Sequence, residues 1–168
     1  MMRVRLRAME PEDLDFLYRI ENDTQLWDVG PTNVPYSRFL LHEYMSNVTG
    51  DIYTDHQARL MIENDSGEVV GIADLVNFDA KHRRAEVGIV IEKAYRNQGY
   101  ATSAVLQLKD YARQVIHLHQ FYAYVAEENV ASLRLFTKVG FVQNAKLSDW
   151  LYDGNSYHGA WLLQCFLK

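Results

Sequence analysis

The sequence predicts an α/β fold in which helices flank a mixed sheet that is mostly antiparallel. Short segments of alternating or continuous apolar residues are interspersed with longer segments whose apolar residues recur at helical spacing. Polar turns containing glycine separate two pairs of adjacent strand segments, a pattern typical of hairpins. The expected order of elements is β-α-α-β-β-β-α-β-α-β-β, which favours one sheet with helices packed on it.

The first half of the chain is expected to form a strand, two helices and a hairpin. Pro11 suits the first position of a helix, and the acidic residues Glu12 and Asp13 suit its first turn because of the helix dipole. Ser37 is expected to cap a second helix that ends near Asn47. The expected strands cover residues 4–7, 58–63 and 69–76, and residues 22–36 and 48–56 are expected to be irregular.

The second half is expected to alternate strands with helices and to end in a hairpin. Asn129 is expected to cap the last helix, and Gly140 is expected to end it. Asp153 and Gly154 suit the turn of the closing hairpin. The expected strands cover residues 85–91, 120–125, 142–151 and 156–167, and a long helix is expected over residues 99–116.

Composition limits the classes to which the protein can belong. The length of 168 residues suits one domain, residues 1–168, and the net charge of −5 argues against a nucleic-acid partner, which a basic face would bind. The single cysteine, Cys165, lies in an apolar segment, so we expect a buried thiol and a reducing compartment. The N-terminus lacks a signal-peptide core, and no apolar segment approaches the about 20 residues that span a bilayer. We therefore expect a cytoplasmic protein with no membrane partner.

The segment 86–101 is the most informative part of the sequence. It reads as an apolar strand, a loop with the pattern Arg-x-x-Gly-x-Ala, and the start of a long helix. Such a junction directs free backbone N–H groups and the positive end of a helix dipole at one point, which suits a phosphate. Gly99 has no side chain at the point where a ligand would approach the backbone, and Ala101 places only a small side chain in the first helical turn. Arg96 adds a cation that can pair with a phosphate. Taken alone, the pattern also fits an ordinary strand-to-helix turn.

The segment 129–141 is the second informative motif. From its residues alone it is an amphipathic helix that is capped at its start and ends at a glycine. A helix of this kind implies no catalytic or binding role. Together, the two motifs resemble the GNAT-type N-acetyltransferases, and they are most similar to the branch with the spermidine/spermine and ribosomal-protein N-terminal acetyltransferases. This resemblance implies the GNAT (acyl-CoA N-acyltransferase) fold and acetyl-CoA as cosubstrate. It implies CoA binding by Ile89, Val90, Ile91, Arg96, Asn97, Gln98, Gly99, Tyr100, Ala101, Asn129 and Ser132.

The implied reaction is direct attack of a primary amine on the thioester, the amine belonging to a small molecule such as a polyamine or to a peptide N-terminus. Strand alternation separates Glu86 from the apolar row of its strand, and the resemblance implies that an acid at this position acts as the general base, often through water. The backbone N–H of Ile89 is the candidate donor to the thioester carbonyl, and Gly88 is expected to permit a bulge that frees it. The alternatives are a Glu86 that pairs with Arg84 or is hydrated, and an Ile89 N–H that forms an ordinary ladder bond.

One departure from the family pattern concerns the leaving group. Many members place a tyrosine, taken to protonate the departing thiolate, where this chain has Phe136. Either another group serves, or no acid is needed, since a CoA thiol with a pKa near that of cysteine, about 8.5, is a tolerable leaving group. The other candidate donors are Tyr100, Tyr122, Tyr124, Ser132 and water. The departure keeps open a non-catalytic acyl-CoA-binding or sensing module, and a transferase for another acyl-CoA is a further alternative.

The sequence says less about the acceptor and other partners. The acidic residues near the first two helices, Glu21, Asp23, Asp28 and Glu43, are more typical of solvated surface residues than of amine ligands. The six histidines show no zinc-like spacing, and no nucleotide-binding glycine motif is present, so no metal is expected. Trp161 and Phe166 suit either the core or a subunit contact, which leaves a homo-oligomer open.

Overall fold

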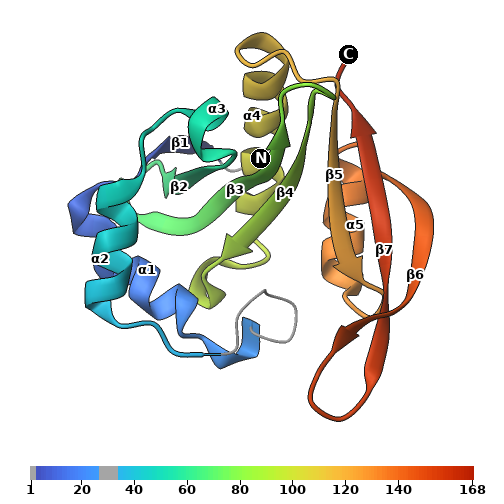
Figure 1. The fold of residues 1–168 in the computed structure, drawn as a ribbon, viewed down its shortest axis with the longest axis horizontal. Helices are drawn as coiled ribbons and strands as arrows, with labels where there is room; N and C mark the ends of the chain where they lie inside the picture. Colours follow the sequence, from blue (N-terminus) through green and yellow to red (C-terminus); the bar gives the residue numbers. More distant parts are fainter. Residues whose placement is uncertain (1–2, 27–33) are drawn as a thin grey trace.

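The computed structural model describes residues 3–26 and 34–168. One seven-stranded sheet runs through it in the order β1-β2-β3-β4-β5-β7-β6, and every neighbouring pair is antiparallel except β4 and β5. Helices lie on both faces of the sheet (Figure 1). The expected fold class, a mixed and mostly antiparallel sheet flanked by helices, is confirmed.

The expected strands and main helices form within a few residues of their expected bounds. The strands are β1 Val4–Ala8, β2 Ala58–Asn64, β3 Val69–Asp79, β4 Arg84–Ile91, β5 Gln120–Ala126, β6 Val142–Tyr152 and β7 Tyr157–Phe166. The α-helices are α1 Leu14–Glu21, α2 Arg38–Asn47, α3 Ile52–Asp55, α4 Tyr100–Gln114 and α5 Val130–Lys138, and short 3-10 turns cover Pro11–Asp13, Thr24–Leu26 and Lys93–Tyr95. The expectation that residues 48–56 are irregular is wrong at Ile52–Asp55, because Asp51 accepts a hydrogen bond from the Tyr53 N–H and caps α3.

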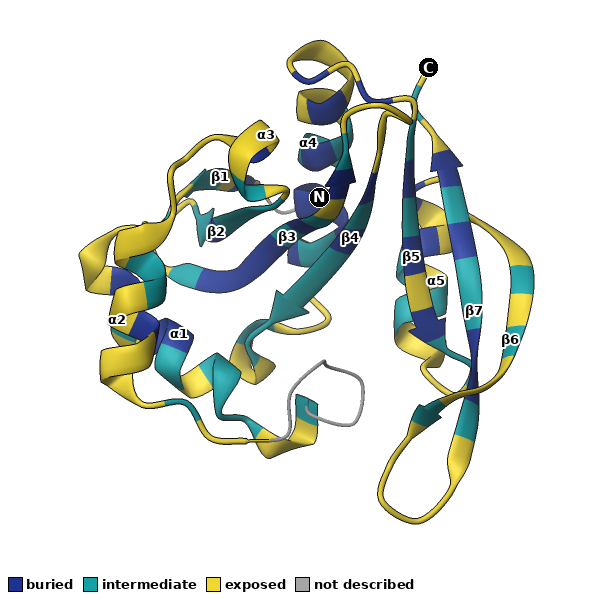
Figure 2. Ribbon diagram, viewed as in Figure 1, coloured by how far each residue is buried: buried dark blue, intermediate teal, exposed yellow. Residues whose placement is uncertain are grey.

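The two faces of the sheet bury different clusters. On one face, α4 and α5 pack their apolar sides on the strands, and α4 contributes Ala104, Val105 and Leu108, all fully buried. On the other face, α1 and α2 cover only β2 and β3, where Met61 and Ile72 meet the helices. The part of that face formed by β4 and β5 stays half-buried or exposed (Figure 2). Within the described residues, this uneven cover leaves part of one sheet face without a helix over it.

The parallel pair β4–β5 separates after only three residue pairs. The last of them is Glu86 with Tyr122. Beyond it β4 stays paired with β3 as far as Ile91, and β5 stays paired with β7 as far as Ala126. The two strands therefore diverge towards their C-terminal ends, as Figure 1 shows.

Gly71 lies opposite Ile91, the last residue of β4, where β4 has moved away from β5. Its lack of a side chain allows β3 and β4 to approach closely there. A Cβ added to Gly71 would lie 2.2 Å from the carbonyl oxygen of Val90, a contact that only a backbone shift relieves. We expect Gly71→Ala to lower the free energy of unfolding by about 1–3 kcal/mol, as overpacking typically does. Gly88→Ala is the matched control on the same strand pair, since its Cβ meets nothing closer than 3.6 Å. Equal unfolding midpoints for the two variants would contradict this account.

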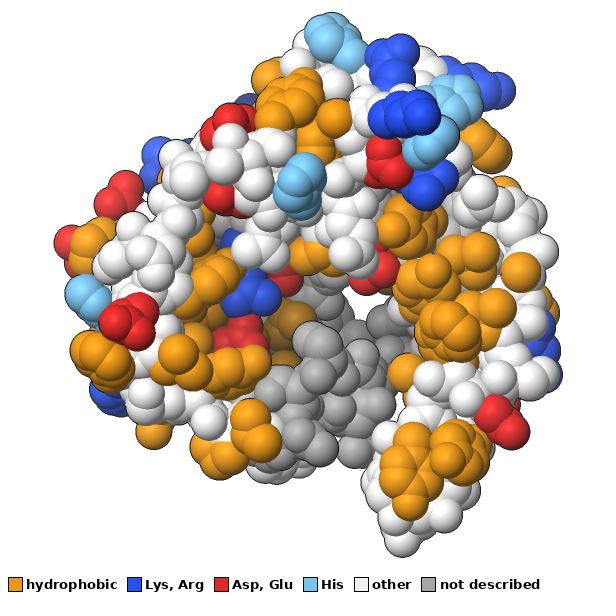
Figure 3. All heavy atoms as spheres, viewed as in Figure 1, with side chains coloured by type: hydrophobic (Ala, Val, Ile, Leu, Met, Phe, Trp, Pro, Cys, Tyr) orange, Lys and Arg blue, Asp and Glu red, His pale blue; other side chains and the backbone are white. Residues whose placement is uncertain are grey.

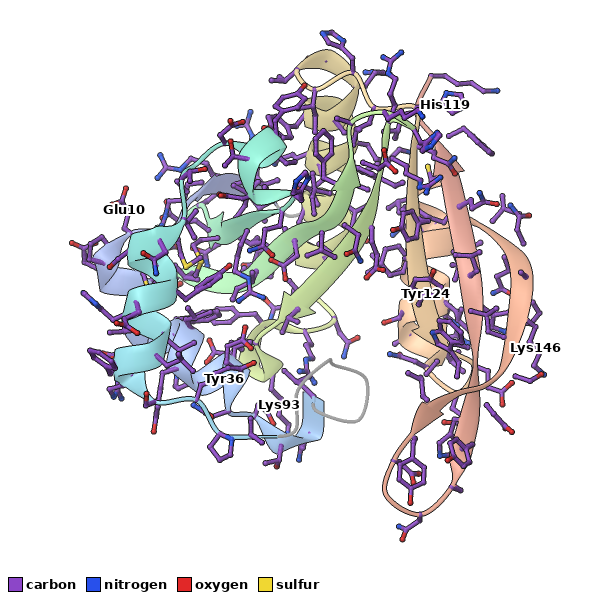
Figure 4. The ribbon with its side chains drawn as sticks, viewed as in Figure 1. Glu10, Tyr36, Lys93, His119, Tyr124 and Lys146 are labelled. Carbon is purple, nitrogen blue, oxygen red and sulfur yellow. The ribbon has the colours of Figure 1, made fainter. Side chains whose placement is uncertain are left out.

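Residues near the C-terminus fall into two groups. Cys165 is buried, as expected, and Trp161 is half-buried against the main core. Phe166 remains 49% exposed, and its ring centroid lies 5.4 Å from that of His119, which Figure 4 labels at the end of the sheet.

Candidate active site

The loop between β4 and α4 forms an open cluster of backbone donors. Gly99 has a left-handed backbone, with φ of 86°, and its carbonyl accepts the first bond of α4, from the Ser103 N–H at 3.1 Å. Within the described ranges, no protein group accepts a hydrogen bond from the backbone N–H groups of residues 97–102. Arg96 lies beside them, and its Nε donates to the Ile91 carbonyl at 2.9 Å. Free N–H groups at the positive end of a helix dipole make a site suited to a phosphate.

The hydrogen-bond pattern of β4 determines where the Ile89 N–H points. At one end, the Glu92 N–H donates to the carbonyl of Val70 in β3, at 2.8 Å. At the other end, the carbonyl of Arg83 accepts from the His119 N–H on the β5 side, also at 2.8 Å. Backbone groups of successive residues in a strand alternate between its two neighbours. Both contacts therefore direct the even-numbered residues of β4 towards β3 and the Ile89 N–H towards β5, beyond the last β4–β5 pair.

The bulge expected at Gly88 is not formed, so that expectation is wrong. The β3–β4 register runs without a shift from Gly71–Ile91 to Val76–Glu86, and Gly88 lies opposite Asp74. The divergence of β4 from β5, which no local sequence signal marks, leaves the Ile89 N–H without a partner among the described strands on that side.

Glu86 lies at the point where the two strands separate. Glu86 is half-buried, and its carboxylate accepts a hydrogen bond from the Asn77 amide at 3.5 Å. Arg84 contacts Asp79 at 3.6 Å, so the alternative of a Glu86–Arg84 pair is not realised. Burial raises the pKa of Glu86, and the Asn77 hydrogen bond only partly opposes this. The raised pKa makes Glu86 a stronger proton acceptor than an exposed carboxylate.

The turn between β5 and α5 lies at the same end of the parallel pair as the β4–α4 loop. Asn129 caps α5, its side-chain oxygen accepting from the Ser132 N–H at 3.2 Å. Ser132 is half-buried in the first turn of the helix. Because α4 and α5 pack on the same face, the two loops stand on either side of the divergence. A ligand held by both loops would lie along the gap between β4 and β5.

The position of Phe136 belongs to the core. Its ring is 5% exposed and lies edge-on to Phe141 at 4.9 Å between centroids. Of the other candidate donors, Tyr100 is also buried, whereas Tyr122 is half-buried and Tyr124 is 42% exposed. Tyr122 and Tyr124 lie on the face of the sheet that carries Glu86, because Tyr122 is in register with it.

An ion cluster beside the site was missed by sequence reasoning. Arg59 contacts Asp74 at 2.9 Å and Glu21 at 2.6 Å, and its guanidinium lies 5.8 Å from the ring centre of Tyr44. Asp74 stands opposite Gly88 in β4, so the cluster borders the site. The expectation that Glu21 is a solvated surface residue is wrong. Of the other acids in that group, Glu43 is exposed, the Asp23 carboxylate accepts from the Gln25 N–H, and Asp28 lies outside the described residues.

The described residues hold neither a membrane-spanning helix nor a metal-binding cluster. No helix among them is long and apolar enough to cross a membrane. Nor does that part of the chain hold a group of three or more His, Cys, Asp or Glu residues placed to bind a metal ion.

Comparison with known proteins identifies the family. A family model described as an acetyltransferase (GNAT) domain matches residues 3–142. The spermidine N(1)-acetyltransferase of Escherichia coli (strain K12) is 30% identical over 157 residues, which cover 94% of this chain and 82% of that protein. The putative ribosomal N-acetyltransferase YdaF of Bacillus subtilis (strain 168) is 30% identical over 92 residues, covering 55% of this chain and 50% of that protein.

A solved structure shows the same fold. The spermidine N-acetyltransferase from Vibrio cholerae, in complex with CoA and spermine, matches with a TM-score of 0.86 at 24% identity, covering 98% of this chain and 96% of that chain. The chain therefore belongs to the GNAT acetyltransferase family, and it is an acetyl-CoA-dependent N-acetyltransferase.

Proposed function

We propose that this protein transfers the acetyl group of acetyl-CoA to a primary amine by direct attack within a ternary complex. The observation that carries the proposal is the divergence of β4 and β5 between a half-buried carboxylate and a cluster of free N–H groups. One end of the gap suits a diphosphate, and the other end suits an amine. One continuous sheet supports a single domain, and the single buried cysteine supports a cytoplasmic location.

Acetyl-CoA would lie along the gap between the diverging strands. Its pyrophosphate would accept hydrogen bonds from the N–H groups of residues 97–102, with the Arg96 cation beside it. Its pantetheine arm would follow the backbone of residues 89–91 on one side and contact Asn129 and Ser132 on the other. The thioester carbonyl would then accept a hydrogen bond from the Ile89 N–H, which stabilises the negative charge that develops on the oxygen.

The chemistry requires two protons to leave the nitrogen, one before it attacks and one after the N–C bond has formed. An aliphatic amine has a pKa near that of lysine, about 10.4, so it arrives mostly as an ammonium ion. Glu86, directly or through one water, accepts a proton, and the nitrogen lone pair forms the N–C bond. The C–S bond then breaks and CoA leaves as a thiolate, while the nitrogen gives up its second proton to water or to that thiolate. Phe136 lies in the core and cannot donate a proton to the departing thiolate. A thiol with a pKa of about 8.5 can leave as the thiolate without such a donor.

The test is release of CoA thiol from acetyl-CoA across a panel of amines. The panel holds polyamines, aminoglycosides, amino acids and peptides with free N-termini. We expect turnover above the hydrolysis background with a small aliphatic amine. Measurable acetyl-CoA binding with no turnover on any amine would reject the proposal and favour an acyl-CoA sensor. Competition between acyl-CoAs of different chain length separates an acetyltransferase from a transferase of another acyl group.

A further inference from the structure

Strand β3 contains a bulge beside Glu86. The β3–β4 register shifts between Val76 and Asp79. As a result, Asn77 and Phe78 together face a single residue of β4. Asn77 has a left-handed backbone, with φ of 50°. Asparagine is one of the few residues with a side chain that adopt this conformation at little cost, so the residue type suits the bulge.

The bulge exchanges the directions of two side chains. Leu75 is fully buried in the core cluster under α4 and α5, so regular alternation would place Asn77 in that cluster and Phe78 on the opposite face. The structure shows the reverse. Phe78 is buried in that cluster with its ring centroid 5.2 Å from that of Tyr53, and Asn77 is exposed. The bulge thereby places Asn77 on the face of the sheet that carries Glu86.

The Asn77 amide contacts one oxygen of the Glu86 carboxylate. It donates a hydrogen bond to Oε1 at 3.5 Å, and no other side chain among the described residues donates to this carboxylate. Hydrogen bonds of catalytic groups are often long in an unliganded enzyme and shorten when the substrate binds. Because each carboxylate oxygen accepts independently, Oε2 stays available to a proton. On this face the surface is hollowed between β4 and β5 (Figure 3), where the amine would enter.

The other titratable groups near Glu86 are paired elsewhere or neutral. They are Asp74 and Glu21, which pair with Arg59, Asp79, which contacts Arg84, and Tyr122 on β5. Among the described residues, no cation lies within ion-pair distance of the Glu86 carboxylate. Burial raises the pKa of Glu86, and the hydrogen bond from Asn77 lowers it. Within the described part of the chain, Asn77 is therefore the group that favours the ionised carboxylate.

We propose that Asn77 is the positioning residue of Glu86: the bulge brings its amide to Oε1 and so orients the carboxylate with Oε2 free to accept the proton of the amine. The inference rests on the proposed function, in which Glu86 is the base. A neutral donor suits this task. A cation in its place would hold the carboxylate ionised so strongly that Glu86 would be a poor base, whereas an amide offsets only part of the effect of burial.

The test follows the titration of Glu86 itself and needs no turnover. NMR of isotope-labelled glutamate carboxyl carbons reports this titration, and Glu86→Gln identifies the signal. Asn77→Gly removes the amide and keeps the left-handed backbone, so the pKa of Glu86 should rise. Asn77→Asp also tolerates that backbone but places a second carboxylate beside Glu86, so the pKa should rise further. Where Glu86 is partly protonated, kcat/KM of Asn77→Gly should fall by about 2–10-fold, the effect of one hydrogen bond.

Asn77→Ala separates the role of the amide from that of the backbone. It lacks the amide, as Asn77→Gly does, but it strains the left-handed conformation, so only Asn77→Ala should lower the urea midpoint of unfolding. Positioning by the amide predicts the same rise in the pKa of Glu86 in both variants. A rise confined to Asn77→Ala, or no rise in either variant, would overturn the inference. A rise in both without turnover on any amine would uphold the hold of Asn77 on Glu86 and reject the transfer reaction.

Discussion

Glu86→Gln is expected to lower kcat by about 10²–10⁴-fold, the usual contribution of a general base. Glutamine keeps the shape of the side chain and its contact with the Asn77 amide, but it does not accept a proton from an ammonium ion. Glu86 lies at the start of the divergence, whereas the free N–H groups of residues 97–102 lie at the far end of β4. We therefore expect the affinity for CoA, measured by calorimetry, to be unchanged.

The pH dependence gives an independent check on the same residue. Burial raises the pKa of Glu86, and only the deprotonated carboxylate acts as a base. The kcat/KM of the wild type should therefore rise with pH through a limb that lies above the usual Glu pKa of about 4.3, and Glu86→Gln should lack this limb. A raised folded-state pKa also means that the ionised carboxylate destabilises the fold above both pKa values. The variant is accordingly expected to be at least as stable as the wild type at neutral pH.

Glu43→Gln is the matched control for charge. It makes the same chemical change at an exposed position of α2, and it should leave both kcat and the affinity for CoA unchanged. If Glu86→Gln lost rate and CoA affinity in equal measure, Glu86 would be a structural residue of the CoA site and not the base.

Arg59→Met is expected to lower the free energy of unfolding by about 3 kcal/mol, because it removes the cation that Arg59 supplies to two partly buried carboxylates. The side chains of Arg59, Glu21 and Asp74 are only 24%, 20% and 18% exposed. Water therefore hydrates the two carboxylate charges poorly when the Arg59 cation is removed. This exposure places the expected cost at the lower end of the range for buried pairs. Urea unfolding followed by circular dichroism measures it.

The destabilised variant should recover stability in acid. Burial raises the pKa of Asp74, and Arg59 opposes that shift in the wild type. Without Arg59 the folded-state pKa rises further above the unfolded value, so protonation favours the folded chain as the pH falls from 7 towards 5. The triple variant with Glu21→Gln and Asp74→Asn removes both charges and should restore much of the loss at neutral pH. A triple variant no more stable than Arg59→Met would show that packing, not charge, explains the effect.

Much of the fold was predictable because its signals are local. The side chains of Ser37 and Asn129 accept hydrogen bonds from backbone N–H groups at the starts of their helices. Gly99 adopts a left-handed backbone conformation at the position where the phosphate-binding pattern calls for a glycine. Alternation in β4 correctly separated Glu86 from the apolar row. The prediction failed at α3, where one aspartate cap outweighs a polar and otherwise irregular composition.

The ion cluster shows why other features were not predictable. The turn of the β2–β3 hairpin pairs Glu63 with Val69, and a regular ladder from there would place Arg59 opposite Ala73. A register shift between Ile62 and Glu63 brings Arg59 opposite Asp74 instead. One residue of register exchanges the two faces of a strand, so no pattern in the sequence reveals this contact.

The sequence by itself determined the order of elements, the phosphate-binding junction at Arg96 to Ala101 and the face on which Glu86 lies. These depend on capping, turn chemistry and periodicity, which act between residues close in the chain. Only the tertiary structure decided that β4 leaves β5 after Glu86, that Arg59 neutralises two acids beside the site, and that a bulge in β3 turns Asn77 towards Glu86. Those features depend on strand pairing and on bulges between distant segments, where small shifts in register redirect side chains that the sequence alone cannot place.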